Sequence, residues 1–123
     1  MKWLDIRFKR NEYDDDIPEL YNLETAVYIG PYYNLRGPGD HVWAIVYNTE
    51  QKPESKTFSK DDYVFYAEHF WSDINLLEYL TDLQKLISAY LRSTEQMLII
   101  QMDKPEEFKL QLKHLQEKEL LPS

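Results

Sequence analysis

The 123-residue sequence contains no cysteine, which excludes a disulfide framework, a thiolate zinc site and a cysteine nucleophile. It also has no run of 18 apolar residues, so we expect no membrane-spanning helix and no membrane partner. Asp5 lies where a secretory signal peptide would need an apolar core, so we expect no such signal. Together these absences favour a cytoplasmic location.

Positive charge is missing from two long stretches of the chain. Neither residues 11–35 nor residues 61–84 contain Lys or Arg, and each stretch carries six acids, including Asp14, Asp15 and Asp16 in the first. The net charge of the whole chain is −8, which argues against direct binding of nucleic acid. Two interpretations stay open: a solvated acidic surface that aids solubility, or a negative patch that steers a basic partner.

Glycine is also scarce, and all three glycines fall in the Gly30–Asp40 segment, together with two prolines. Unusual backbone geometry is therefore concentrated in one loop, which we expect to be a long hairpin connection. The same segment contains Tyr32, Tyr33 and Arg36, residue types that dominate interface hot spots. It has neither a Walker spacing nor GxGxxG, so it is no phosphate cradle.

No arrangement of residues in the sequence indicates metal binding or catalysis with any specificity. The triplet Asp14–Asp16 lacks the spacing of an EF-hand, and the three histidines are far apart in sequence and form no zincin pair. His41 beside Asp40 is the best candidate for a general base, with Arg36 to hold an anion, but such pairs are common at loop ends. We therefore expect no metal, no cofactor and no enzymatic activity.

Tyrosine is abundant by contrast, with ten Tyr against five Phe. Packing of a core alone would favour Phe, because each buried Tyr hydroxyl needs a hydrogen-bond partner. The excess of Tyr is therefore typical either of half-exposed rings at a binding surface or of rings that cap the edges of a core.

The hydrophobic pattern predicts a single α+β domain over residues 1–123, built on one mixed or antiparallel sheet of about four strands with two or three helices. A short turn is expected at Glu19–Tyr21. The strands are expected at Leu4–Phe8, Ala26–Ile29, Val42–Tyr47 and Leu98–Gln101. Val42–Tyr47 is apolar on both faces, which indicates a central strand.

Helices are predicted at Ile74–Leu91 and Glu106–Glu117 from apolar residues at helical spacing. The first helix should bury a broad stripe: Leu76, Leu77, Leu80, Leu83, Ile87, Tyr90 and Leu91. The segment Tyr63–Phe70 fits a helix by its spacing and a strand by its composition, and we favour the helix.

These observations predict a non-enzymatic protein-binding module, in concrete form an inhibitor of the immunity or antitoxin type. Such a protein neutralises a basic partner, for example a nuclease toxin, with carboxylates and aromatic anchors. The expected partner-binding residues are Asp14, Asp15, Asp16, Tyr32, Tyr33 and Arg36. The alternative from another class is a small-ligand-binding or catalytic α+β domain that uses the Gly30–Asp40 loop with Arg36 and His41.

Overall fold

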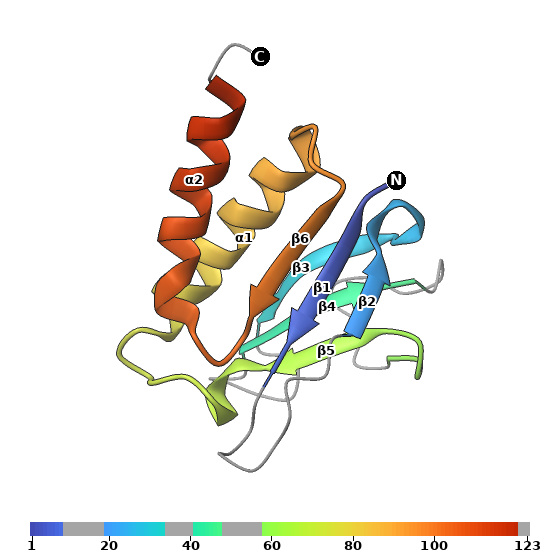
Figure 1. The fold of residues 1–123 in the computed structure, drawn as a ribbon. Helices are drawn as coiled ribbons and strands as arrows, with labels where there is room; N and C mark the ends of the chain where they lie inside the picture. The colour runs from blue at the N-terminus through green and yellow to red at the C-terminus, as the bar shows by residue number, and fades with distance from the viewer. Residues whose placement is uncertain (9–18, 34–40, 48–57, 121–123) are drawn as a thin grey trace. The chain divides into compact units, whose positions relative to one another are not determined.

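The computed structural model describes residues 1–8, 19–33, 41–47 and 58–120 (Figure 1). The chain divides into two compact units. The first unit consists of Met1–Glu24 and Thr81–Ser123, and the second is Thr25–Leu80, which is inserted in the chain between them. Each unit holds one three-stranded sheet. The α+β class is thus confirmed, whereas the prediction of one four-stranded sheet is wrong.

The sheet of the first unit has the strand order β2-β1-β6. Strand β1 (Trp3–Arg7) pairs antiparallel with β2 (Glu19–Asn22) and parallel with β6 (Met97–Gln101). The strand predicted at Leu98–Gln101 is confirmed. At Glu19–Tyr21, where a short turn was expected, the chain forms a strand and only then a 3-10 turn, Leu23–Thr25. The ladder with β1 overrides a local sequence that has no alternating pattern.

Helices α1 (Leu76–Arg92) and α2 (Phe108–Leu120) follow the predicted helices closely. A 3-10 turn at Pro105–Glu107 precedes α2, as the proline at that position favours. The stripe of α1 needs a correction, because Leu77 and Leu91 are 57% and 41% exposed while Leu86 is fully buried. The side chains that α1 buries are Leu76, Leu80, Leu83, Leu86, Ile87 and Tyr90, at spacings of one, three and four residues.

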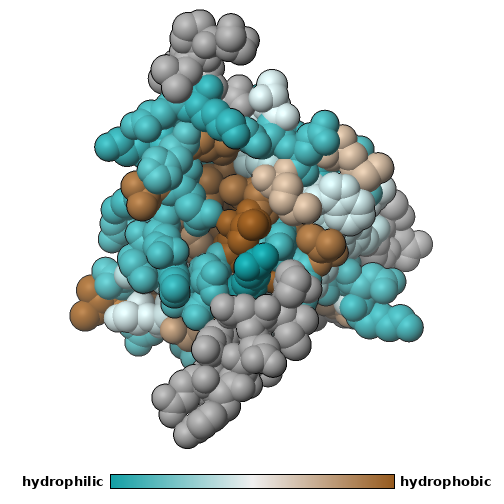
Figure 2. All heavy atoms as spheres, viewed as in Figure 1, coloured by the Kyte–Doolittle hydropathy of each residue, from teal (hydrophilic) through white to brown (hydrophobic). Residues whose placement is uncertain are grey.

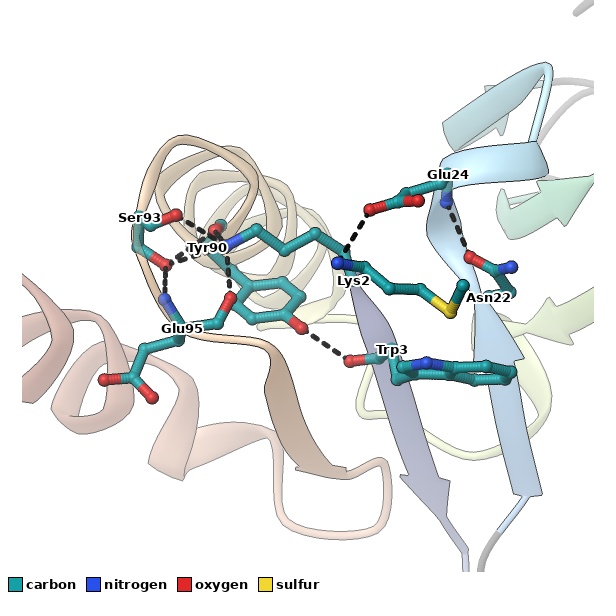
Figure 3. A network of polar contacts seen from close by, with 8 residues as sticks. Lys2, Trp3, Asn22, Glu24, Tyr90, Ser93 and Glu95 are labelled. Atoms are coloured by element: carbon teal, nitrogen blue, oxygen red, sulfur yellow. Dashed lines mark hydrogen bonds and ion pairs between the residues drawn. The ribbon is translucent and has the colours of Figure 1, made fainter.

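A lysine from the start of the chain holds the C-terminal end of α1 (Figure 3). The Lys2 Nζ donates to the carbonyl oxygens of Tyr90 (3.1 Å), Ser93 (2.5 Å) and Glu95, and lies 4.7 Å from the centre of the Tyr90 ring. The last carbonyls of a helix have no partner within it and attract a cation. Lys2 therefore fastens the start of β1 to the end of α1.

The Tyr90 phenol makes a second link between the same two elements. Its hydroxyl donates to the carbonyl oxygen of Trp3 at 2.7 Å, and the ring is fully buried. Burial raises the pKa of the Tyr90 phenol; the bond to Trp3 lowers it in part and Glu95 raises it further. Tyr90 is thus one of the tyrosines that complete a core rather than a binding surface.

The sheet of the second unit has the order β3-β4-β5, with both pairs antiparallel. Its strands are β3 (Tyr28–Tyr33), β4 (His41–Val46) and β5 (Tyr63–Tyr66). Strand β4 lies in the middle, and Val42–Val46 are buried on both faces, as the sequence predicts. The strand expected at Ala26–Ile29 begins only at Tyr28 and continues through Pro31 to Tyr33, because an edge strand tolerates a proline.

The prediction of a helix at Tyr63–Phe70 is wrong. The segment forms β5, followed by a 3-10 turn at Ala67–His69. The four residues of β5 pair with Val42–Ile45 of β4. Their β-branched and aromatic composition, which favours a strand, therefore outweighs their helical spacing. Asp62, just before β5, accepts hydrogen bonds from the backbone N–H groups of Ser59 (3.0 Å) and Tyr47 (2.9 Å).

Neither helix in the described part of the chain has the length and apolar character needed to cross a membrane.

Candidate functional site

The clearest candidate site lies in the second unit, where the chain passes from β5 into α1. Three large hydrophobic side chains are exposed there within eight residues: Phe70 (46%), Ile74 (91%) and Leu77 (57%). Single exposed hydrophobic residues are common, but a group of them next to charges marks an interaction site. The exposed residues His69, Phe70, Asp73, Ile74, Leu77 and Glu78 are called the 69–78 surface below.

Hydrogen-bonded turns hold the backbone of the 69–78 surface. The Ala67 carbonyl accepts the N–H groups of Phe70 (3.1 Å) and Trp71 (2.9 Å), and further on the Asn75 N–H reaches the Ser72 carbonyl at 3.0 Å. The Trp71 side chain is only 5% exposed. A partner would therefore meet side chains on an ordered backbone, which lowers the entropic cost of binding.

Aromatic contacts anchor this segment to the sheet. The Trp71 ring lies 4.9 Å from the ring of Phe65, which is on β5 and 4% exposed, and 5.7 Å edge-on to Tyr79 of α1. The Phe70 ring also stacks on Phe65, with 5.5 Å between the two ring centroids. The exposed Phe70 is thus continuous with buried aromatic rings.

The charge of the second unit, in the part that the structure describes, is mostly negative. The described residues of the second unit contain five acids, Asp61, Asp62, Glu68, Asp73 and Glu78, against one base, Lys60, so their net charge is 1 − 5 = −4. Two of these carboxylates accept hydrogen bonds from backbone N–H groups: Asp62, described above, and Glu68, whose Oε2 lies 3.1 Å from the His41 N. A surface of this kind attracts cationic groups.

The negative charge of this unit also affects the pKa of the Tyr47 phenol. Burial, and in second place the Asp62 carboxylate, raise the pKa of Tyr47 to about 12. Tyr47 follows β4 directly, and its backbone N–H is held by that carboxylate at 2.9 Å. Asp62 therefore has a structural role at the end of the β4–β5 pair, and its charge adds to the field of the second unit.

A second group of exposed hydrophobic residues lies on the sheet of the first unit. Leu20 (56%) and Ile99 (45%) are the cross-strand neighbours of Asp5, and Met97 is 45% exposed. Figure 2 shows hydrophobic side chains over the strands of this sheet. Asp5 and Arg7 form an ion pair on β1, with Oδ2 and Nη2 3.2 Å apart. Since both signs of charge are present, this face does not favour a basic partner.

The structure describes only part of the partner-binding set expected from the sequence. Asp14–Asp16 and Arg36 lie outside the described residues. Tyr33 is the last residue of β3 and is paired with His41. Tyr32 is 1% exposed and packs edge-on against Tyr28 (5.0 Å) and Phe58 (5.2 Å), so its ring belongs to the core of the second sheet.

The 69–78 surface was not found from the sequence, although one signal for it was present. Residues 69–78 fall inside the cation-free stretch 61–84. Leu77 was assigned to the buried stripe of α1, and Phe70 to a helix that the chain does not form. The usable signal was the presence of hydrophobic residues within a stretch whose charged residues are all acidic. A helix face that is buried in the core does not require such a stretch.

Metal binding finds no support in the described parts of the chain, where no three His, Asp or Glu side chains gather as a metal ion would require. His41 begins β4, and its backbone N–H is held by Glu68. The other carboxylate oxygen of Glu68, Oε1, lies 4.0 Å from the His69 Nε2.

No protein-family model, no curated protein and no solved structure is significantly similar to this chain.

Proposed function

We propose that this protein is a non-enzymatic binding module that inhibits a basic protein partner, of the immunity or antitoxin type, such as a nuclease toxin in the cytoplasm. The observation that carries the proposal is the 69–78 surface, where exposed hydrophobic side chains lie in a field of negative charge. An enzyme inhibitor needs both properties, because apolar anchors supply affinity and charge supplies speed and selectivity.

The hydrophobic part can supply the affinity. Phe70 and Ile74 are four residues apart, so their Cα atoms lie within about 14 Å of each other. Burial of a Phe, Ile or Leu side chain in an interface contributes roughly 1.5–3 kcal/mol. With Leu77, three such anchors form the centre of a standard interface, which buries about 800 Å² on each partner.

The charged part selects the partner. A net charge of −4 over the described residues of the second unit favours a cationic surface and repels an acidic one. Asp73 and Glu78 flank Ile74 and Leu77 and are exposed, as the polar rim of an interface requires. An active site that binds nucleic acid is a surface with the matching charge.

The residues expected from the sequence enter the proposal in different ways. Asp14–Asp16, Tyr33 and Arg36 remain proposed contacts, with the triplet acting through its charge. The ring of Tyr32 is buried, so this residue stabilises the fold and does not touch a partner directly. We expect Tyr32→Ala to lower the free energy of unfolding.

The test is affinity capture from the organism that makes the protein, with matched surface variants. The double variant Ile74→Ser/Leu77→Ser removes two exposed anchors, and Leu110→Ser removes a hydrophobic side chain that is 52% exposed on α2. We expect the wild type and Leu110→Ser to retain one basic protein in equimolar amount and the double variant to lose it. The purified partner should then lose its activity when the wild type is added.

Two results would contradict the proposal. One is a retained protein that is acidic or that binds the double variant as well as the wild type. The other is the behaviour expected of a small-ligand or catalytic domain: Arg36→Ala and His41→Ala abolish binding of a small molecule, while the 69–78 variants do not matter.

A further inference from the structure

The sheet of the first unit has one buried face and one partly exposed face. Successive side chains of a strand point to opposite faces, and Leu4 and Ile6 of β1 are at most 2% exposed. The alternate residues of β1 therefore lie on the other face, together with their cross-strand partners in β2 and β6. This second face, called the Ile99 face below, includes Trp3, Asp5, Arg7, Leu20, Met97 and Ile99.

Hydrophobic side chains of the Ile99 face reach the solvent (Figure 2). Leu20 is 56% exposed, and Met97 and Ile99 are each 45% exposed. A group of exposed hydrophobic residues on one face marks an interaction site, and tryptophan and methionine are among the residue types enriched at interfaces. The Ile99 face is therefore a surface that a protein would cover.

The charge of the Ile99 face selects its occupant. Asp5 and Arg7 are the two charged residues of the six, and their ion pair, with Oδ2 and Nη2 3.2 Å apart, leaves the face with no net charge. The whole chain, by contrast, has a net charge of −8. A strongly acidic or strongly basic partner gains nothing from a neutral face. Two copies of the same acidic chain, however, meet with the least repulsion there.

The ion pair also makes the Ile99 face complementary to itself. Asp5 and Arg7 are two residues apart on β1, so the pair is a dipole along the strand. Packed sheets lie about 10 Å apart, and a second copy turned by 180°, with its β1 antiparallel to the first, places its positive end over the negative end of the first. Stacking with parallel β1 strands places like charges over each other. Each copy keeps its own ion pair in the antiparallel arrangement.

The size of the face predicts a weak association. Strands lie about 4.8 Å apart and rise about 3.3 Å per residue, so three strands of four or five residues cover roughly 14 Å by 17 Å. A standard interface buries about 800 Å² on each partner, and smaller interfaces belong to transient complexes. We therefore expect a dissociation constant between about 10 μM and 1 mM.

We infer that the Ile99 face binds a second copy of this chain, sheet against sheet, in a two-fold symmetric dimer with antiparallel β1 strands. The exposed side chains of Leu20, Met97 and Ile99 make the contact, and the Asp5–Arg7 pairs set the direction of stacking. The inference goes beyond the proposed function and is independent of it, because no residue of the 69–78 surface takes part.

Sedimentation velocity of the full chain over a range of concentrations is the first experiment. We expect a monomer at about 1 μM and a growing fraction of dimer towards about 1 mM. The association should strengthen between about 0.01 M and 0.15 M salt, because salt screens the repulsion between two chains that each carry a charge of −8. A chain that stays monomeric throughout, or a dimer that salt weakens, would overturn the inference.

Charge variants of one exposed position test whether the Ile99 face forms the dimer. Ile99→Asp and Ile99→Lys each place like charges in the symmetric interface, so each variant alone should weaken self-association at least about tenfold. An equimolar mixture of the two should associate again, since opposite charges then meet. The control is Ile74→Asp, which adds the same acid at a 91% exposed position of the second unit and should still form the dimer.

The mixture separates a specific interface from a loss of folding. Circular dichroism shows whether each variant is folded, and Leu20→Asp with Leu20→Lys repeats the test on β2 if a variant at position 99 is not. Folded variants that dimerise as the wild type does, or a mixture that does not restore the dimer, would overturn the inference.

Affinity capture distinguishes this inference from the proposed function. We expect Ile99→Asp to retain the captured partner, and Ile74→Asp to lose that partner but still dimerise. Loss of the partner with Ile99→Asp would assign the Ile99 face to the partner and overturn the inference. Retention of the partner by both variants would contradict the proposed function and leave the dimer standing.

Discussion

Replacement of Lys2 by methionine tests the contact that fastens β1 to the end of α1. Methionine has a similar unbranched length and can still cover the Tyr90 ring, but it has no charge and no donor. The change removes the bonds from Nζ to the carbonyl oxygens of Tyr90, Ser93 and Glu95. The end of α1 thereby loses its cation and three hydrogen bonds.

The magnitude follows from the geometry. A cation at a partly buried helix C-terminus contributes up to about 2 kcal/mol. The contact over the Tyr90 ring, with Nζ 4.7 Å from the centroid, adds about 0.5–1 kcal/mol. Water can reach some of the freed carbonyls, so the hydrogen bonds do not add in full. We therefore expect Lys2→Met to lower the free energy of unfolding by about 2–3 kcal/mol.

Urea unfolding followed by circular dichroism measures this loss. The control is Lys85→Met, which removes a lysine from an exposed position of α1 and should change stability by no more than about 0.5 kcal/mol. Equal unfolding midpoints for Lys2→Met and wild type would refute the role assigned to Lys2. Equal losses for the two variants would show that only the overall charge matters.

Three further predictions concern packing, pH and charge. Leu83→Ala should cost about 2–5 kcal/mol and the exposed Glu78→Ala no more than about 0.5 kcal/mol; equal melting shifts would mean that the phase of α1 is wrong. Because the pKa of Tyr47 is raised from 10.0 to about 12, its contribution to stability is complete below pH 10 and lost as pH rises towards 12. Tyr47→Phe should therefore reduce the alkaline loss in a pH series of unfolding curves, and an unchanged series would contradict this. Replacement of Asp14–Asp16 by Asn should slow association with the captured partner and leave the melting temperature unchanged; an unaltered on-rate would remove the triplet from the interface.

The elements with long or clear patterns could be predicted from the sequence. Leu4 and Ile6 alternate with polar residues in β1, and the continuous apolar segment of β4 is buried on both faces. The four-residue strands β2 and β5 are too short for a pattern to be read, and pairing with a neighbour decides them.

The division into two sheets depends on pairing between remote segments, which no local pattern contains. Trp3 pairs with Met97, near the other end of the chain, while β4 pairs with its neighbours in sequence. The candidate site was missed for a similar reason. Leu77 has the spacing of a buried helix residue, and only the packing of the first turn of α1 leaves it exposed.

The association rate of the captured partner, measured as a function of salt, tests the central claim most directly. The screening length falls from about 30 Å at 0.01 M to about 8 Å at 0.15 M ionic strength, so an association steered by charge must slow over this range. We expect Asp73→Asn/Glu78→Gln to lower the on-rate at low salt and to weaken its salt dependence, with the fold unchanged. An on-rate that responds neither to salt nor to these substitutions would contradict the account of the 69–78 surface as the binding site for a basic partner.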